Sequence, residues 1–154
     1  YEKQQEVLQS VTRNEETFVH AAHKTGKTHI AALTAIWFFF SRTPARVVVS
    51  SSSEEQLRNV LWAEILHMIN TSAIPLPFVI NKFRITKVQQ SGSEQTYSQD
   101  LLLGAVTRTG ENLQGYHLQR DKPRTLVIFD EASAVPDNFY ESASSLDHPG
   151  LAMC

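Results

Sequence analysis

The 154-residue sequence has one cysteine, Cys154, and no apolar run long enough to cross a membrane. A lone cysteine excludes an internal disulfide framework and a thiolate metal cluster. The longest apolar stretch, residues 30–40, is interrupted by Thr34 and is about half the length that a bilayer requires. We therefore expect a protein without membrane spans, in a reducing compartment such as the cytoplasm.

The chain also lacks a strong charge excess. Its formal net charge is −2, and 42% of its residues are hydrophobic. These values exclude a disordered tail, and they exclude a uniformly basic protein that coats nucleic acid. Residues 82–124 carry seven Lys or Arg against four Asp or Glu, and residues 125–154 carry acids only. This basic region fits a local DNA contact, but an ordinary solvated surface explains it better.

Short apolar runs alternate with helical patterns along the chain, and sequence repeats are absent. This alternation predicts an α/β fold with a mostly parallel sheet sandwiched by helices. A polar segment between residues 88 and 101 is expected to form a hairpin loop. The expected helices cover residues 2–11, 27–41, 53–70 and 137–145, and the expected strands cover residues 17–22, 46–50, 85–88, 101–103 and 125–129.

Residues 21–28 match the phosphate-binding pattern Gly-x-x-x-x-Gly-Lys-Thr except that Ala21 replaces the first glycine. Gly26 would let the backbone approach the phosphates of ATP, Lys27 would neutralise the β- and γ-phosphates, and the Thr28 hydroxyl would bind Mg²⁺. Gly-Lys-Thr is also a common tripeptide that can simply mark a loop before a helix. The expected strand before it and helix after it favour the phosphate site.

The second motif is the strand at residues 125–129, which delivers Asp130 and Glu131 to its carboxyl end. Parallel α/β sheets bind their ligands at that edge. Asp130 would hold Mg²⁺ through water, and Glu131 would polarise the attacking water. Two solvated acids closing a strand are the plainer alternative, but the phosphate motif upstream makes a site for ATP and Mg²⁺ the better interpretation.

The phosphate loop itself contains further candidates for contacts with the nucleotide, His23, Lys24 and Thr25. Either His23 or Lys24 could reach the γ-phosphate as charge spreads in the transition state. Lys24 is the better catalytic candidate because a histidine is largely neutral near pH 7. A solvated surface lysine is an equally good interpretation.

Together with these motifs, further segments resemble the ATPase domain of the large terminase subunit, the DNA-packaging motor of tailed bacteriophages. Residues 1–8 resemble its adenine-reading segment, which implies that Gln4, or else Gln5, contacts adenine. Residues 47–52 followed by Gln56 resemble its second strand and the next helix. The run at residues 111–117, leading into the acidic strand, is the most specific likeness.

The resemblance implies a P-loop NTPase fold of the RecA-like type and an ATPase that powers packaging of double-stranded DNA into procapsids. The implied partners are DNA, a portal protein, a small terminase subunit and further copies in a ring, in the cytoplasm of a host cell. Two alternatives stay open: a nucleotide-binding docking module without turnover, and a helicase-like ATPase.

The end of the sequence departs from this family's pattern. We expect residues 1–154 to be a partial, C-terminally truncated ATPase domain without the nuclease domain, because the pattern of residues 147–154 predicts a connection that breaks off. The strand that would follow should lie between the phosphate-loop strand and the acidic strand. Its absence predicts a gap in the sheet and a chain whose stability depends on a partner.

Overall fold

The computed structural model describes residues 2–22, 25–91, 94–106, 124–144 and 149–153. Its helical elements are α1 (Glu2–Arg13), α2 (Lys27–Ser41), α3 (Glu54–Gln56), the π-helical η1 (Leu57–Trp62), α4 (Ala63–Asn70), the 3₁₀ turn η4 (Ala132–Ala134) and α5 (Asp137–Ser144). Its strands are β1 (Glu16–Phe18), β2 (Ala45–Ser51), β3 (Phe78–Asn81), β4 (Arg84–Ser91), β5 (Glu94–Val106), β6 (Arg124–Phe129) and β7 (Pro149–Met153).

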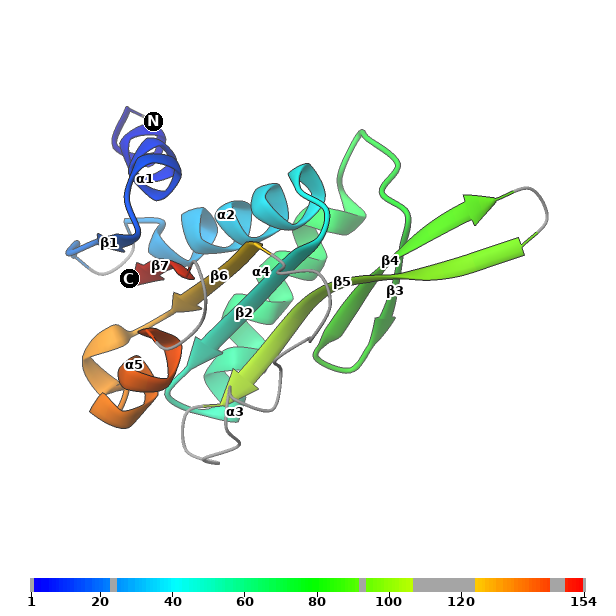
Figure 1. Ribbon diagram of the computed structural model, residues 1–154. Coiled ribbons are helices and arrows are strands. Elements are labelled where there is room, and N and C mark those ends of the chain that lie inside the picture. Colours follow the sequence, from blue (N-terminus) through cyan, green and yellow to red (C-terminus); the bar gives the residue numbers. More distant parts are fainter. Residues whose placement is uncertain (1, 23–24, 92–93, 107–123, 145–148, 154) are drawn as a thin grey trace.

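Within the described part of the chain the strands form one seven-stranded sheet in the order β1-β7-β6-β2-β5-β4-β3. The first five strands in this order, β1, β7, β6, β2 and β5, are parallel to one another. β4 and β3 continue the sheet with antiparallel pairing (Figure 1). The predicted α/β fold with a mostly parallel sheet is therefore confirmed. Among the described residues, no helix combines the length and apolar composition needed to cross a membrane.

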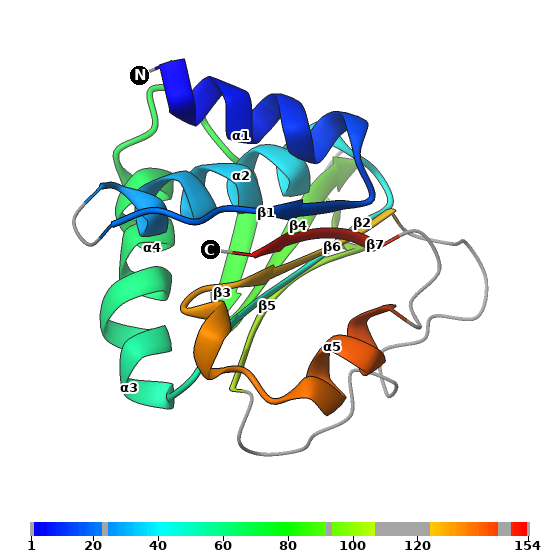
Figure 2. The same cartoon turned by 90° about the vertical axis from the view of Figure 1, so that its left-hand side faces the viewer.

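Helices cover both faces of the sheet, α1, α2 and α4 on one side and α5 on the other (Figure 2). Because side chains alternate along a strand, the successive valines of β2 serve both cores. Val47 and Val49 pack with α2 and α4 in the larger core, while Val48 joins Phe129 and Val135 in the smaller core under α5. A continuous valine run thus marks a strand buried on both faces.

The helix bounds predicted from apolar spacing agree closely with the structure. α2 has the predicted bounds, and its apolar character all the way round matches its burial between α1, α4 and the sheet. The helical run from α3 to α4 begins at Ser53, whose side chain accepts a hydrogen bond from the Gln56 N–H. Leu57, Leu61 and Ile65 recur at helical spacing along this run and are buried in the core, but the π-helical η1 in its middle was not predicted.

The hairpin of β4 and β5 was predicted, but its strands are much longer than expected. The ladder continues to the pair Ser91 and Glu94, so the polar segment expected to be a loop is mostly strand. β3 was missed, and β1 ends at Phe18 rather than at residue 22. The added lengths of β4 and β5 were missed because their polar residues show no apolar alternation, the pattern by which strands are found.

The predicted gap in the sheet is wrong. β7 lies between β1 and β6 and is parallel to both, with Met153 in register with Phe18 on one side and with Phe129 on the other. This is the position expected for the strand that was thought to be missing. A run that contains Pro149 and Gly150 reads as punctuation, but backbone pairing on both sides holds it as a strand. The expected dependence of stability on a partner therefore loses its basis.

Candidate functional site

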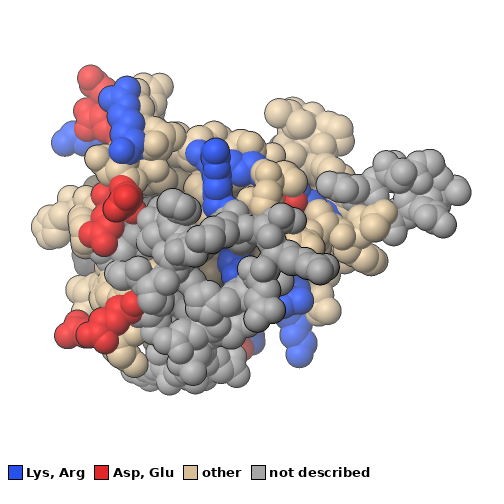
Figure 3. Space-filling view, in the orientation of Figure 1, with Lys and Arg blue, Asp and Glu red and all other residues tan. Residues whose placement is uncertain are grey.

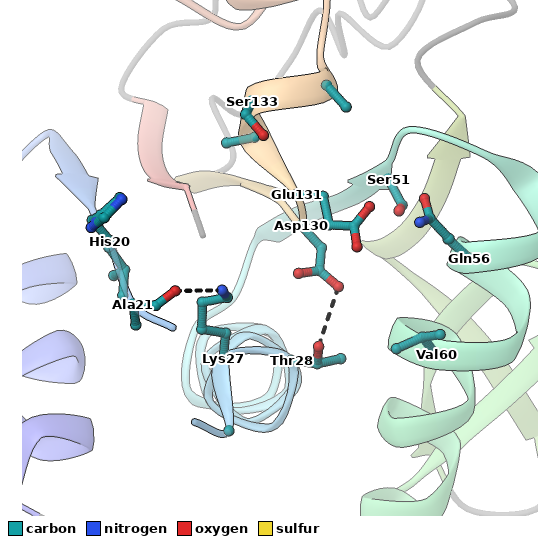
Figure 4. Close-up of a pocket in the computed structure, with 14 residues that line it drawn as sticks. His20, Ala21, Lys27, Thr28, Ser51, Gln56, Val60, Asp130, Glu131 and Ser133 are labelled. Carbon is teal, nitrogen blue, oxygen red and sulfur yellow. Dashed lines mark hydrogen bonds between the residues drawn. The ribbon is translucent and has the colours of Figure 1, made fainter. Parts of the chain in front are cut away.

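Two loops meet at the carboxyl ends of the parallel strands. The segment after β1 leads to Gly26 and the start of α2, and β6 ends at Asp130 and Glu131. A cavity of about 790 Å³ lies between them, walled also by Ser51 at the end of β2 and by Gln56 (Figure 4). The structure therefore brings both sequence motifs to one cavity, at the edge where α/β sheets bind their ligands.

Gly26 shapes the first wall. Its φ of 85° and ψ of 22° lie in the left-handed region, which glycine adopts without steric cost. A Cβ at this position would lie 3.2 Å from the Gln4 amide nitrogen, so the missing side chain also lets α1 approach the loop. The first turn of α2 has no acidic residue and no side-chain cap. Its N–H groups and the positive end of the helix dipole are therefore available to an anion.

Lys27 folds back over this wall. Its Nζ donates a hydrogen bond of 2.7 Å to the carbonyl oxygen of Ala21, the residue that stands where the motif usually has glycine. The ammonium group is partly buried at the cavity and close to the start of α2. Its positive charge therefore lies beside the cavity, where it favours the binding of an anion.

Thr28 and Asp130 meet across the cavity although they are 102 residues apart in sequence. The Thr28 hydroxyl donates to Asp130 Oδ2 at 3.4 Å (Figure 4). Asp130 is only 6% exposed, and its backbone N–H donates to the Ser50 carbonyl oxygen at 2.9 Å. This arrangement offers a hydroxyl and a carboxylate from two different elements, and Mg²⁺ prefers such hard oxygen ligands.

Burial raises the pKa of Asp130, and the neighbouring negative charge of Glu131 raises it further. Three groups oppose this rise in pKa: the Thr28 hydroxyl, the Glu131 N–H and the charge of Lys27. A carboxylate that burial disfavours in its charged form gains from a nearby cation. The residues present therefore fit a divalent cation bound between Thr28 and Asp130.

The raised pKa of Asp130 gives a prediction for stability. An acid whose pKa is higher in the folded state binds protons more readily there, so stability falls as pH rises from the ordinary value of 3.8 through the raised one. At pH 7, in the presence of a chelator that removes divalent cations, we expect Asp130→Asn to unfold at a higher urea concentration than the unchanged chain. This advantage should shrink toward pH 3. A stability gain in Asp130→Asn that does not change with pH would contradict the raised pKa of Asp130.

Glu131 provides the remaining acid of the cavity. Its φ of 58° and ψ of 51° are in the left-handed region, which a side chain other than glycine, Asn or Asp seldom adopts. Such backbone strain is concentrated at functional sites. The Glu131 carboxylate points into the cavity beside Asp130 (Figure 4), where it can accept a proton from a bound water.

The other predicted contacts fall into three groups. One group lies outside the described residues: His23, Lys24 and the run at residues 111–117.

Thr25 lines a second cavity of about 540 Å³, and its hydroxyl donates a hydrogen bond to the Ala22 carbonyl oxygen at 2.8 Å. Gln4 lines that same cavity, whereas Gln5 is exposed on α1. Because Gly26 and Lys27 border both cavities, a ligand can extend from one into the other.

Sequence reasoning missed part of the lining. Ser51, His20 and Ser133 border the main cavity, and Gln56 was noted only for its likeness to a family segment. Ser51 was noted only as part of residues 47–52, which resemble a family strand. Since β2 and β6 are adjacent and parallel, with Ser50 in register with Phe129, the last residue of β2 lies beside the residues that follow β6. That adjacency is the indication that could have found Ser51.

No protein-family model matches this sequence, and no curated protein sequence matches it. Solved structures are similar. The ATPase domain of the Thermus phage P74-26 large terminase superposes with a TM-score of 0.68 at 14% identity, over 96% of this chain and 62% of that chain. The large terminase of the thermophilic bacteriophage D6E gives TM-scores of 0.68 and 0.67 in two crystal forms, at 16% and 17% identity.

The chain thus has the fold of large terminase ATPase domains. Against the D6E large terminase, 98% and 100% of this chain are covered, but only 37% and 38% of that longer chain. The chain therefore spans less than two thirds of the length of each of these structures. The predicted resemblance is confirmed at the level of the fold.

Proposed function

We propose that this domain binds ATP with Mg²⁺ and hydrolyses it, as the motor domain of a phage terminase large subunit. One observation carries the proposal: the Thr28 hydroxyl and the buried Asp130 carboxylate lie 3.4 Å apart beside Lys27, at the start of a helix with a free N-terminal turn. Each part of this arrangement suits one part of a magnesium nucleotide.

In this proposal the first turn of α2 and Lys27 bind the phosphates, and Lys27 exchanges its bond to Ala21 for one to a phosphate oxygen. Thr28 and Asp130 hold Mg²⁺, which when bound offsets the negative charge of the phosphates. Glu131 accepts a hydrogen bond from a water and orients it for attack. Lys24 supplies further positive charge, with His23 as the alternative donor.

The second cavity suits the base and sugar of the nucleotide. It shares Gly26 and Lys27 with the main cavity, and its lining extends to Thr25 and to Gln4 on α1. The Gln4 carboxamide has both a donor and an acceptor and can pair with the polar edge of adenine. This placement supports ATP as the substrate and Gln4, rather than the exposed Gln5, as the adenine contact.

Packaging of double-stranded DNA, assembly into a ring, and contacts with a portal protein and a small terminase subunit in a host cytoplasm belong to the same proposal. The fold likeness supports them. Among the described residues in Figure 3, Lys and Arg are scattered over the face rather than gathered in one patch. We therefore assign no DNA-binding surface on this face.

Titration of Mg²⁺-ATP into the chain tests the proposal. Hydrogen bonds to charged groups contribute about 1.5–3 kcal/mol, so Lys27→Ala should weaken binding by roughly 10-fold to 100-fold. Lys82→Ala, which removes a lysine from the exposed turn between β3 and β4, is the matched control and should bind as the unchanged chain does. Equal affinities of all three proteins would overturn the phosphate site.

Release of phosphate from the same samples then separates two candidate functions. An ATPase releases phosphate only when Mg²⁺ is present, and Lys27→Ala reduces the rate. A docking module would bind the nucleotide with the same dependence on Lys27 but release no phosphate.

A further inference from the structure

Gln56 borders the main cavity together with Asp130 and Glu131, and the proposed function gives it no role. Figure 4 shows its side chain near Ser51 and the acidic pair, across from Lys27. Gln56 ends the short helix α3, and the π-helical η1 begins at the next residue. π-Helical turns are rare and often mark functional sites. Val60, one turn along η1, borders the same cavity.

Neighbouring hydroxyls fix the orientation of the Gln56 carboxamide. Its Oε1 accepts hydrogen bonds from the Ser52 hydroxyl and, at 3.4 Å, from the Ser53 hydroxyl. A carboxamide has one acceptor oxygen and one NH₂ group with two donors. With the oxygen bound to the two serines, the NH₂ group is left as the free end, and it has no partner among the residues that the structure describes.

The wall that carries Gln56 is anchored to the rest of the site. Ser53 accepts a hydrogen bond from the Gln56 backbone N–H at 3.2 Å, which fixes the start of the helix. Farther along the same helical run, Glu64 pairs with His29 Nδ1 at 2.8 Å, and His29 follows Thr28 directly in α2. The position of Gln56 is therefore tied to the helix that would bind the phosphates.

We infer that the Gln56 NH₂ group donates a hydrogen bond to the terminal phosphoryl group of the nucleotide and so positions it beside Glu131. The Gln56 NH₂ group has two N–H donors and lies near Asp130 and Glu131. It can therefore bind a phosphate oxygen that Mg²⁺ does not bind. ADP lacks the terminal group, so Gln56 distinguishes ATP from ADP and is a positioning residue. This inference rests on the proposed function of the same cavity.

Gln56→Glu tests the inference because it separates the amide from the helix cap. Glutamate at this position of a Ser-x-x-Glu capping box supports the helix start as well as glutamine does. It keeps the acceptor oxygen for Ser52 and replaces the NH₂ group by a second oxygen. A purely capping role would therefore be untouched, whereas the donor to the terminal phosphate would be replaced by a negative charge that repels it.

Affinities for ADP and for a non-hydrolysable ATP analogue are measured with Mg²⁺ by calorimetry. We expect Gln56→Glu to weaken binding of the analogue at least tenfold, with a change in ADP affinity of less than threefold and an unchanged melting temperature. Glu55→Gln, a charge change at an exposed position in the same helical turn, is the matched control and should leave the ratio of the two affinities unchanged.

An unchanged ratio in Gln56→Glu would overturn the inference and leave Gln56 as a cap residue only, provided that Lys27→Ala still weakens binding. Failure of the unchanged chain to bind either nucleotide would overturn the proposed function and the inference with it. The two failures are therefore distinguishable.

Discussion

Glu131→Gln is expected to slow ATP turnover by about 10²-fold to 10⁴-fold, the range that a general base contributes. Glutamine has nearly the same shape as glutamate, but its amide cannot accept a proton from water. The left-handed backbone at residue 131 is equally demanding for both side chains, so the substitution changes the chemistry and not the geometry. Binding of Mg²⁺-ATP should stay within a few fold of the unchanged chain.

Steady-state phosphate release with excess Mg²⁺-ATP measures this effect, and calorimetry on the same protein reports the affinity. Glu141→Gln is the matched control, since Glu141 is an exposed acid of α5 and does not border the main cavity. Turnover that survives Glu131→Gln would remove the proposed role of Glu131. A loss of binding together with turnover would instead place Glu131 among the groups that hold the nucleotide.

Phe39→Ala is expected to lower the free energy of unfolding by about 3–5 kcal/mol, the usual cost of removing a large buried side chain. Phe39 is fully buried in the larger core, and its ring lies edge-on to Phe40 with centroids 5.0 Å apart. The surrounding cluster includes residues of α2, α4 and the sheet, so a cavity there loosens the packing between the layers. This loss is a large share of the stability of a typical domain.

Urea unfolding at neutral pH measures the loss. Leu33→Ala, in the same helix, is the control: Leu33 is 37% exposed, and alanine is the best helix former, so we expect a cost near or below 1 kcal/mol. Equal costs for the two variants would mean that α2 does not bury Phe39 against the sheet.

The local patterns of the sequence were enough for the elements that bury apolar surface. α2 and β2 are apolar almost throughout, and the structure buries each against two layers. The helical spacing of Leu57, Leu61 and Ile65 likewise indicates which side of the helical run faces the core. In these elements the side chains themselves carry the hydrophobic free energy, so the residue types reveal the structure.

The candidate site was predictable in its parts. Gly26, Lys27 and Thr28 follow a strand and open a helix, and Asp130 and Glu131 follow another strand, so the two motifs could be placed at strand ends from their neighbours alone. The roles proposed for them rest on the chemistry of those residue types. The distance between Thr28 and Asp130, and the raised pKa of Asp130, required the fold.

Local residue patterns were enough to predict the fold class, the main helices and the two motifs, because burial and turn preferences depend on the side chains of adjacent residues. Three features required the assembled fold: β7 lies between β1 and β6, β4 and β5 form a long antiparallel pair, and the Gln56 amide is turned toward the acidic pair. Backbone hydrogen bonds between distant strands look alike for most side chains, so the sequence does not specify such pairings locally.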